Sequence, residues 1–183
     1  MFRLDLLGTL LSFISTYYFV TANGKTWPIG IAAIVVNIIL YWQAGIYASI
    51  GLKIIYLILS IYGWYLWRSN GNKNPLAITS LTMWHKKLLP IIFILLFVTI
   101  FHLLKNYTNS TILYTEALAV SVSLIAEWLS CKKKIECWTA WFVADAIFIY
   151  IMLYKSLYCH AVLYTVYLAM AIIGFINWRK IQQ

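Results

Sequence analysis

Seven long apolar runs constrain this chain more than any other feature of its sequence. A transmembrane helix needs roughly 17–25 predominantly apolar residues. Runs of that length cover residues 6–22, 27–45, 47–67, 88–104, 112–129, 136–154 and 157–178. Inside a bilayer every backbone hydrogen bond must be made within the protein, and a helix meets that requirement within a single segment. We therefore predict an all-α, polytopic membrane protein with seven transmembrane helices.

The composition also indicates a chain built for lipid. Hydrophobic residues make up 63% of the sequence and charged residues only 10%, whereas soluble domains carry about 25% charged residues. The net charge of +9 is confined to short basic clusters between apolar runs. That placement is typical of membrane topology and not of nucleic-acid binding. We expect the lipid bilayer as a partner and no nucleic acid.

The placement of lysine and arginine predicts which end of the chain lies outside. With the amino terminus outside, the inner loops and the carboxyl-terminal tail hold ten basic residues and the outer side holds three. The inner ones are Lys25, Arg68, Lys73, Lys86, Lys87, Lys132, Lys133, Lys134, Arg179 and Lys180, and the outer ones are Arg3, Lys105 and Lys155. This excess predicts an N-out, C-in protein of the inner (cytoplasmic) membrane.

The sequence of residues 1–67 resembles that of residues 112–178, without a gap, when Asp5 is aligned with Glu116. We call this constant displacement along the chain the repeat offset. The other pairs that it aligns are Ser12 and Ser123, Trp27 and Trp138, Tyr47 and Tyr158, Tyr56 and Tyr167, Gly63 and Gly174, and Trp67 and Trp178. Three helices reverse the direction of the chain, so two copies are parallel only if an odd number of helices separates them. The run at 88–104 matches neither half and supplies that helix.

We therefore predict two parallel three-helix repeats, 1–67 and 112–183, joined by a linker, 68–111, that contains the fourth helix. Parallel repeats related by an axis along the membrane normal are found in transporters, and the binding site lies at the repeat interface near the bilayer midplane. We expect a transporter. A channel or a structural membrane protein is the alternative class.

Asp145 is the residue within these helices that most needs an explanation. A carboxylate near the middle of a bilayer is costly unless it is solvated, paired or neutralised. Trp138, Trp141 and Phe148 share its face of the helix, because all four recur at helical spacing. Aromatic faces beside a carboxylate attract a flat cation, by about 0.5–2 kcal/mol per ring. These residues are the first candidates for a binding site, and an internal ion pair or hydrogen bond that ties helices together is the competing interpretation.

Lys53 on the third helix has two expected positions. It pairs with Asp145, or it extends toward the outer interface, because it begins only about 10 Å into its helix. Further candidate site residues lie on the neighbouring helices. They are Asn37 on the second helix, Tyr56 and Trp64 on the third, and Tyr164, Tyr167 and Asn177 on the seventh.

The sequence offers no pattern that supports catalysis or a cofactor. We find neither a nucleophile–base pair nor metal ligands at a matching depth. The histidines and cysteines lack the spacing of a metal site, and no phosphate-binding G-x-x-x-x-G-K-[ST] loop is present. We expect a protein that is not an enzyme, holds no metal or cofactor, and is not driven directly by ATP.

Three stretches of the chain carry motifs of a known family. They are "IYA" (46–48) followed by "YGWYLW" (62–67), "KKKIECWTAWFVAD" (132–145) and "GFINW" (174–178). The first resembles the second and third helices of the PnuC family of nicotinamide riboside transporters. The second resembles that family's basic loop and W-x-x-W helix, and the third resembles the end of its last helix. The resemblance covers nearly the whole chain and implies a doubled, SWEET-like three-helix fold.

The resemblance also implies facilitated uptake of an unphosphorylated vitamin precursor, usually nicotinamide riboside, which a cytosolic kinase traps. The sequence departs from the family at Lys53, where members often have Gln, and at Asp145, where nicotinamide riboside carriers often have Asn. Relatives are thought to carry thiamine or riboflavin. Nicotinamide riboside and thiamine are flat cations that suit Asp145, whereas neutral riboflavin gains less from a carboxylate. The expected ligand is a small cationic aromatic vitamin precursor, nicotinamide riboside first and thiamine second. The sequence also allows a homo-oligomer.

Overall fold

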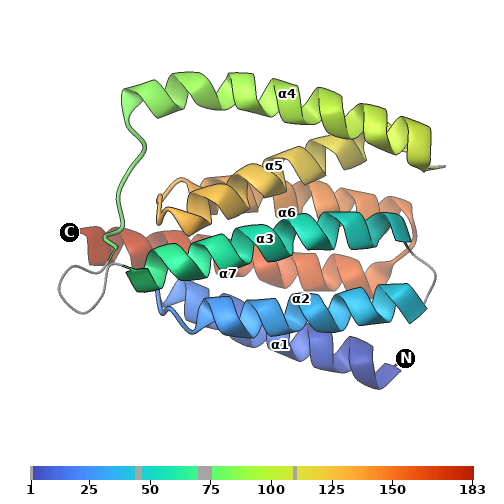
Figure 1. Ribbon diagram of the computed structural model, residues 1–183, viewed down its shortest axis with the longest axis horizontal. Coiled ribbons are helices and arrows are strands. Elements are labelled where there is room, and N and C mark those ends of the chain that lie inside the picture. The colour runs from blue at the N-terminus through green and yellow to red at the C-terminus, as the bar shows by residue number, and fades with distance from the viewer. Residues whose placement is uncertain (1, 44–46, 70–75, 109–110) are drawn as a thin grey trace.

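The computed structural model describes residues 2–43, 47–69, 76–108 and 111–183. Seven helices are described: α1 (Phe2–Val20), α2 (Thr26–Gln43), α3 (Tyr47–Ser69), α4 (Met83–Tyr107), α5 (Leu113–Cys131), α6 (Cys137–Tyr154) and α7 (Tyr158–Gln182). They lie side by side, and the two chain termini are at opposite ends of the bundle (Figure 1). The prediction of an all-α protein with seven helices is confirmed. Ile46 and Lys73 lie outside the described residues, as do the side chains of Arg3, Asp5, Tyr47 and Ala48.

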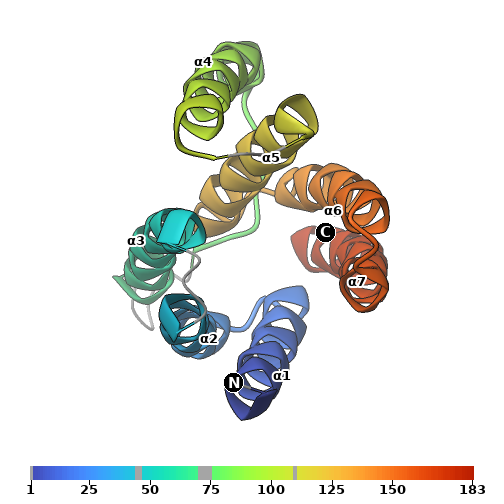
Figure 2. The same cartoon turned by 90° about the vertical axis from the view of Figure 1, so that its right-hand side faces the viewer.

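Six helices form a closed ring, and the seventh lies outside it. Going around the ring, the order is α1, α2, α3, α5, α6 and α7, and α7 packs back on α1 (Figure 2). α4 packs on the outer side of α5. The peripheral helix is thus the one whose sequence matches neither half of the chain.

The helix boundaries follow the repeat offset found in the sequence. α1 spans Phe2–Val20 and α5 spans Leu113–Cys131, while α2 spans Thr26–Gln43 and α6 spans Cys137–Tyr154. Both boundaries of each pair are displaced by the repeat offset. α3 and α7 likewise begin at the matched residues Tyr47 and Tyr158. Equivalent helices run in the same direction (Figure 1), so the two sets of three helices are parallel.

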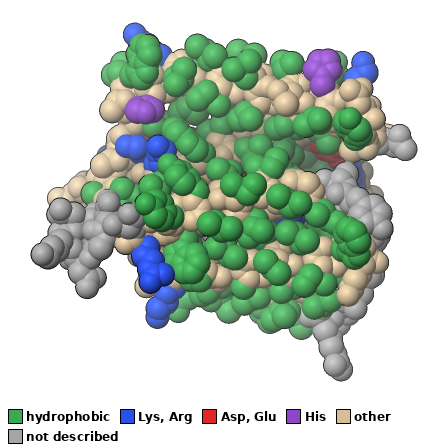
Figure 3. All heavy atoms as spheres, viewed as in Figure 1, with side chains coloured by type: hydrophobic (Ala, Val, Ile, Leu, Met, Phe, Trp, Pro, Cys, Tyr) green, Lys and Arg blue, Asp and Glu red, His purple; other side chains and the backbone are tan. Residues whose placement is uncertain are grey.

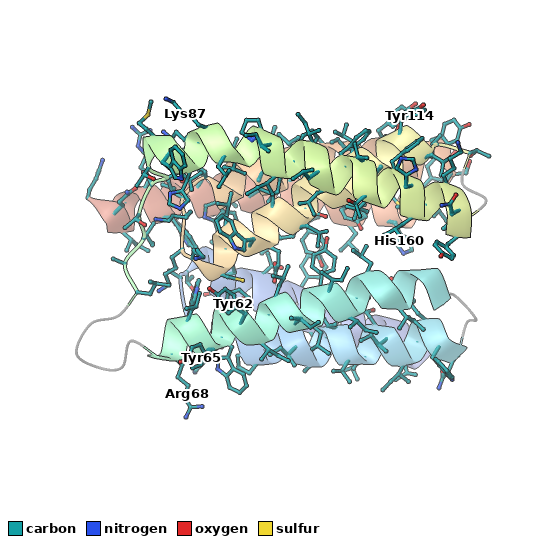
Figure 4. The ribbon with its side chains drawn as sticks, turned by 45° about the horizontal axis from the view of Figure 1, so that its top comes forward. Tyr62, Tyr65, Arg68, Lys87, Tyr114 and His160 are labelled. Carbon is teal, nitrogen blue, oxygen red and sulfur yellow. The ribbon has the colours of Figure 1, made fainter. Side chains whose placement is uncertain are left out.

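The outer surface of the bundle is apolar along its length. Among the described residues, α2, α3, α4, α6 and α7 each contain a stretch long and apolar enough to cross a membrane, and α1 adds a shorter one, Leu6–Val20. Hydrophobic side chains cover the visible helix faces, while Lys and Arg gather mainly at the end that carries the carboxyl terminus (Figure 3). Arg68 and Lys87 point outward at that end, whereas Tyr114 and His160 lie at the other (Figure 4).

The fourth helix begins earlier than its apolar run. The run predicts a helix over 88–104, whereas α4 spans Met83–Tyr107. The additional first turn contains His85, Lys86 and Lys87, whose polarity hides it from a hydropathy count. The segment before α4 is attached to the loop between α5 and α6, because Thr79 N–H donates to Lys133 O (3.1 Å) and Ile135 N–H donates to Thr79 O (3.0 Å). The linker is thereby joined to the second repeat.

Two glycines allow close packing inside each repeat. A Cβ atom added to Gly63 would lie 2.3 Å from the Trp27 ring, and one added to Gly174 would lie 2.4 Å from the Trp138 ring. Real side chains do not approach so closely, so each indole rests directly on the backbone of the facing helix. Each repeat therefore locks its second helix onto its third through a Trp–Gly contact.

Candidate functional site

A cavity of about 400 Å³ lies at the centre of the helix ring. Its described lining comes from α1, α2, α3, α5, α6 and α7, with no residue from α4. The volume falls within the range of small-molecule sites, roughly 300–1,000 Å³. The cavity thus lies at the interface between the two repeats.

Asp145 and its aromatic neighbours form the α6 wall of this cavity. Trp138, Trp141, Asp145 and Phe148 all line it, so the face predicted from their spacing is the one that points inward. Trp141 Nε1 donates to Ser130 Oγ (3.1 Å), which fixes the indole against α5. Phe148 stacks on Tyr164 of α7, with ring centroids 4.8 Å apart and planes at 16°. The wall is therefore built of rings held in place by neighbouring helices.

The Asp145 carboxylate has no partner in the part of the chain that the structure describes. The residue is only 5% exposed, and no hydrogen bond or ion pair reaches its side chain there. Its charge faces the tyrosines of α3 and α7, and Tyr56, Tyr164 and Tyr167 are close enough to interact with it electrostatically. A buried charge without a partner is costly, so the charged form of this carboxylate is disfavoured unless a compensating positive charge enters the cavity.

Lys53 takes neither of the two positions expected for it. Its Nζ lies 6.0 Å from the ring centroid of Tyr41 and 5.9 Å from that of Tyr56, within the cavity lining. Within the described residues it forms no ion pair with Asp145. The acid with which it interacts electrostatically is Glu127 of α5.

Glu127 is a second acid in the cavity lining, and our sequence interpretation left it out of the site. Its Oε1 accepts a hydrogen bond from Ser60 Oγ of α3 (3.1 Å), across the junction between the repeats. The spacing of Ser123, Glu127 and Ser130 would have placed these polar residues on one face of α5. The cavity therefore holds two acidic side chains and one lysine among its described lining residues.

Equivalent residues lie at the two junctions between the repeats. Tyr56 of α3 bonds to Ser123 of α5 (2.5 Å between the hydroxyl oxygens), and the repeat offset relates this pair to Tyr167 of α7 and Ser12 of α1. At the end of the bundle that carries the carboxyl terminus, Trp67 Nε1 donates to Ser130 O (3.3 Å) and Trp178 Nε1 donates to Phe19 O (3.1 Å). The repeat offset relates these two indole hydrogen bonds to each other.

An aromatic cluster lies at that same end of the bundle. The Phe19 ring lies 4.6 Å from the Trp138 ring and 5.0 Å from the Trp178 ring, and Trp27 lies 5.4 Å from Trp67. These rings come from both repeats. Three of them, Phe19, Trp27 and Trp138, also line the cavity.

Comparison with known proteins places this architecture in a family. The sequence profile of the nicotinamide mononucleotide transporter family matches residues 3–180. The chain belongs to that family. Members of the nicotinamide mononucleotide transporter family are membrane transporters, so the predictions of a transporter and against an enzyme are confirmed. A comparison with curated proteins finds no match.

A solved structure shows the same fold. The crystal structure of the vitamin B3 transporter PnuC superimposes with a TM-score of 0.80 at 17% sequence identity, over 98% of this chain and 82% of that one. The resemblance to PnuC noted in the sequence motifs is confirmed by the family and by the fold. As in the family, the helices form a multi-pass membrane protein.

The cavity collects nine of the eleven side chains predicted to form the site. The nine are Asn37, Lys53, Tyr56, Trp138, Trp141, Asp145, Phe148, Tyr164 and Tyr167. Trp64 and Asn177 do not line it. The inward face of α3 runs through Ser60, Gly63 and Trp67 at intervals of three and four, so Trp64 is turned aside and 38% exposed. Asn177 precedes the fully buried Trp178 and is turned aside in the same way.

Sequence interpretation also missed the hydroxyl groups of the first repeat. Ser12, Ser15 and Thr16 of α1 and Thr26 of α2 line the cavity on the side of the first repeat. Serine and threonine are common in transmembrane helices, where their hydroxyls bond to the backbone, so nothing in the sequence singled them out. The equivalence of the two repeats was the available signal, because the mates of Ser12 and Thr16 are Ser123 and Glu127.

Proposed function

We propose that this protein mediates facilitated uptake of nicotinamide riboside, an unphosphorylated, flat cation. The observation that carries the proposal is the partnerless Asp145 carboxylate in an aromatic-walled cavity, among the residues that the structure describes. A pyridinium ring supplies the missing positive charge and presents a flat face to Trp141 and Phe148. Charge pairing and cation–π attraction then act on the same ligand group.

The charges of the cavity favour the riboside over its phosphorylated form. A phosphate group adds negative charge beside Asp145 and Glu127, and Lys53 is the one basic side chain in the described lining. That lysine already lies over two tyrosine rings and interacts with Glu127. Repulsion from two carboxylates therefore outweighs attraction to one lysine that is already engaged.

The same charges support trapping by phosphorylation. A cytosolic kinase that converts the riboside to its phosphate would create a product that the cavity rejects. Net uptake then needs no ion gradient and no ATP at the transporter itself. We propose an inner-membrane protein with its amino terminus outside, in which the units 1–67 and 112–183 move relative to each other and 68–111 serves as the linker.

Thiamine is the second candidate, because the same unpaired carboxylate suits its thiazolium cation. The test is a binding panel on the purified protein in detergent, with nicotinamide riboside, nicotinamide mononucleotide, thiamine and riboflavin. Asp145→Asn and Trp141→Ala are the test variants, and Glu116→Gln is the control, because Glu116 pairs with Lys155 away from the cavity.

We expect nicotinamide riboside to bind most tightly and riboflavin least. Loss of a charge-assisted contact in Asp145→Asn weakens the riboside by about tenfold or more, while Glu116→Gln binds as the wild type does. Tightest binding of thiamine would select the second candidate. Tightest binding of the mononucleotide would contradict the preference for an unphosphorylated ligand, and tightest binding of riboflavin would contradict a site built around a cation.

A further inference from the structure

Equivalent positions of the two repeats carry different chemistry where they face the cavity. The repeat offset gives each lining position of the first repeat a mate in the second. Gly30, Ile34 and Asn37 of the first repeat correspond to Trp141, Asp145 and Phe148 of the second, and all six line the cavity. At these positions the second repeat presents rings and an acid, whereas the first repeat presents smaller, uncharged groups. A pseudo-symmetric cavity with two unlike walls suits a ligand with two unlike ends.

The hydroxyls of the first repeat act as acceptors toward the cavity. Ser15 Oγ donates its proton to Thr26 O (2.8 Å), and Thr16 Oγ1 donates to Ser12 O (2.9 Å). A hydroxyl has one proton and two lone pairs, so each of these groups retains acceptor capacity only. Ser15 and Thr16 are both half-buried and line the cavity. A ligand group that donates hydrogen bonds is therefore the complement to this wall.

The surrounding residues keep this wall accessible. A Cβ atom at Gly30 would lie 2.9 Å from Ser15 Oγ, so a glycine at this position leaves the Ser15 hydroxyl uncovered. The equivalent residue of the second repeat is the bulky Trp141. Asn37 lies against α1, with its Oδ1 3.0 Å from the position of a Cβ at Gly8, and also lines the cavity. Thr26 Oγ1 donates back to Ser15 O (2.9 Å), which fixes the geometry between α1 and α2.

We infer that the hydroxyl-bearing end of the ligand binds the first repeat while its cationic ring binds the second. The sugar hydroxyls donate to Ser15 and Thr16, with Asn37 beside them. This assignment rests on the proposed function and makes these two hydroxyls specificity-determining residues. They distinguish a flat cation that carries a polyhydroxylated substituent from the bare ring.

The test compares two cations that share a ring. Nicotinamide riboside and the N-methylnicotinamide cation differ only in the sugar, and their affinities are measured on wild type and on the Ser15→Ala, Thr16→Val double variant. The matched control is Thr165→Val, because Thr165 also donates to a carbonyl four residues earlier (2.8 Å) but does not line the cavity. Thr16→Ser retains the acceptor and should bind the riboside as the wild type does.

We expect the double variant to lose about tenfold in riboside affinity, about threefold per hydroxyl, and to keep its affinity for the methylated ring within about twofold. Equal losses for both ligands, or no loss for either, would overturn the assignment while leaving the proposed function intact. If the double variant does not fold, Thr16→Val alone carries the test, with a threefold loss for the riboside only. Binding of neither cation to the wild type would contradict the proposed function and this inference together.

Discussion

The hydroxyl of Tyr56 on α3 lies 2.5 Å from the hydroxyl of Ser123 on α5, and this contact joins the first repeat to the second inside the cavity wall. The repeat offset relates this pair to Tyr167 and Ser12 at the other junction. We predict that Tyr56→Phe lowers the stability of the folded protein by about 0.5–1.5 kcal/mol, the usual contribution of one hydrogen bond. Thermal unfolding in detergent measures the change, with Tyr62→Phe, at an exposed position, as the control. Equal unfolding temperatures for Tyr56→Phe and the wild type would show that this bond does not stabilise the junction.

The Trp–Gly contacts predict which glycines tolerate a methyl group. Gly63→Ala and Gly174→Ala place a Cβ atom against the rings of Trp27 and Trp138, and overpacking of this kind costs about 1–3 kcal/mol or more. Gly51→Ala is the matched control on α3, because nothing lies within 4 Å of its added Cβ. We expect the control to fold as well as the wild type and the other two to unfold at lower temperature. Equal behaviour of all three variants would argue against the contacts.

Lys53 places a positive charge in a cavity that we propose for a cation. Lys53→Gln removes that repulsion and frees Glu127, so nicotinamide riboside should bind about three- to tenfold more tightly, in keeping with about 1 kcal/mol for charges in a partly wet site. Lys25→Gln is the control, because Lys25 also lies over a tyrosine ring, 5.8 Å from that of Tyr18, but outside the cavity. Titration calorimetry with each variant gives the comparison. Weaker binding by Lys53→Gln would mean that the lysine contacts the ligand.

Facilitated uptake with trapping predicts how the ligand distributes across a membrane. Proteoliposomes that contain only the protein should fill with nicotinamide riboside until the inside and outside concentrations are equal. Enclosing a riboside kinase with ATP should raise the total label inside well above that level, all of it as the phosphate. Accumulation of unmodified riboside under an imposed proton or sodium gradient would contradict a carrier without ion coupling.

Much of the fold could be predicted from the sequence, because membrane helices and repeats leave strong one-dimensional signals. The apolar runs located seven helices, and the repeat offset paired them before their boundaries were known. The start of α4 was placed too late, at 88 instead of Met83. A hydropathy count detects residues that suit lipid and does not detect helical backbone. It therefore misses a polar first turn of a helix at the membrane interface.

The candidate site could be predicted only in part. The spacing of residues along the sequence shows which of them share one face of a helix, but it does not show what that face contacts in the folded protein. The face of α6 was identified because a carboxylate among rings is unusual. Glu127 was missed because it lies near the end of α5, where the sequence does not tell whether an acid faces the membrane surface or a cavity. Trp64 was included because the sequence does not show which way an aromatic residue near the membrane interface points. The position of Lys53 depends on how its long side chain folds back over Tyr41 and Tyr56, which no sequence pattern records.

The measurement that tests the central claim most directly compares nicotinamide riboside with its reduced, uncharged dihydro form on wild type and Asp145→Asn. The two ligands have nearly the same shape and differ in charge, so their affinity ratio isolates what the carboxylate does. We predict that the wild type prefers the cation by about tenfold or more and that the preference largely disappears in Asp145→Asn. An affinity ratio that is the same in both proteins would contradict the account, because Asp145 would then not be the group that selects the ligand.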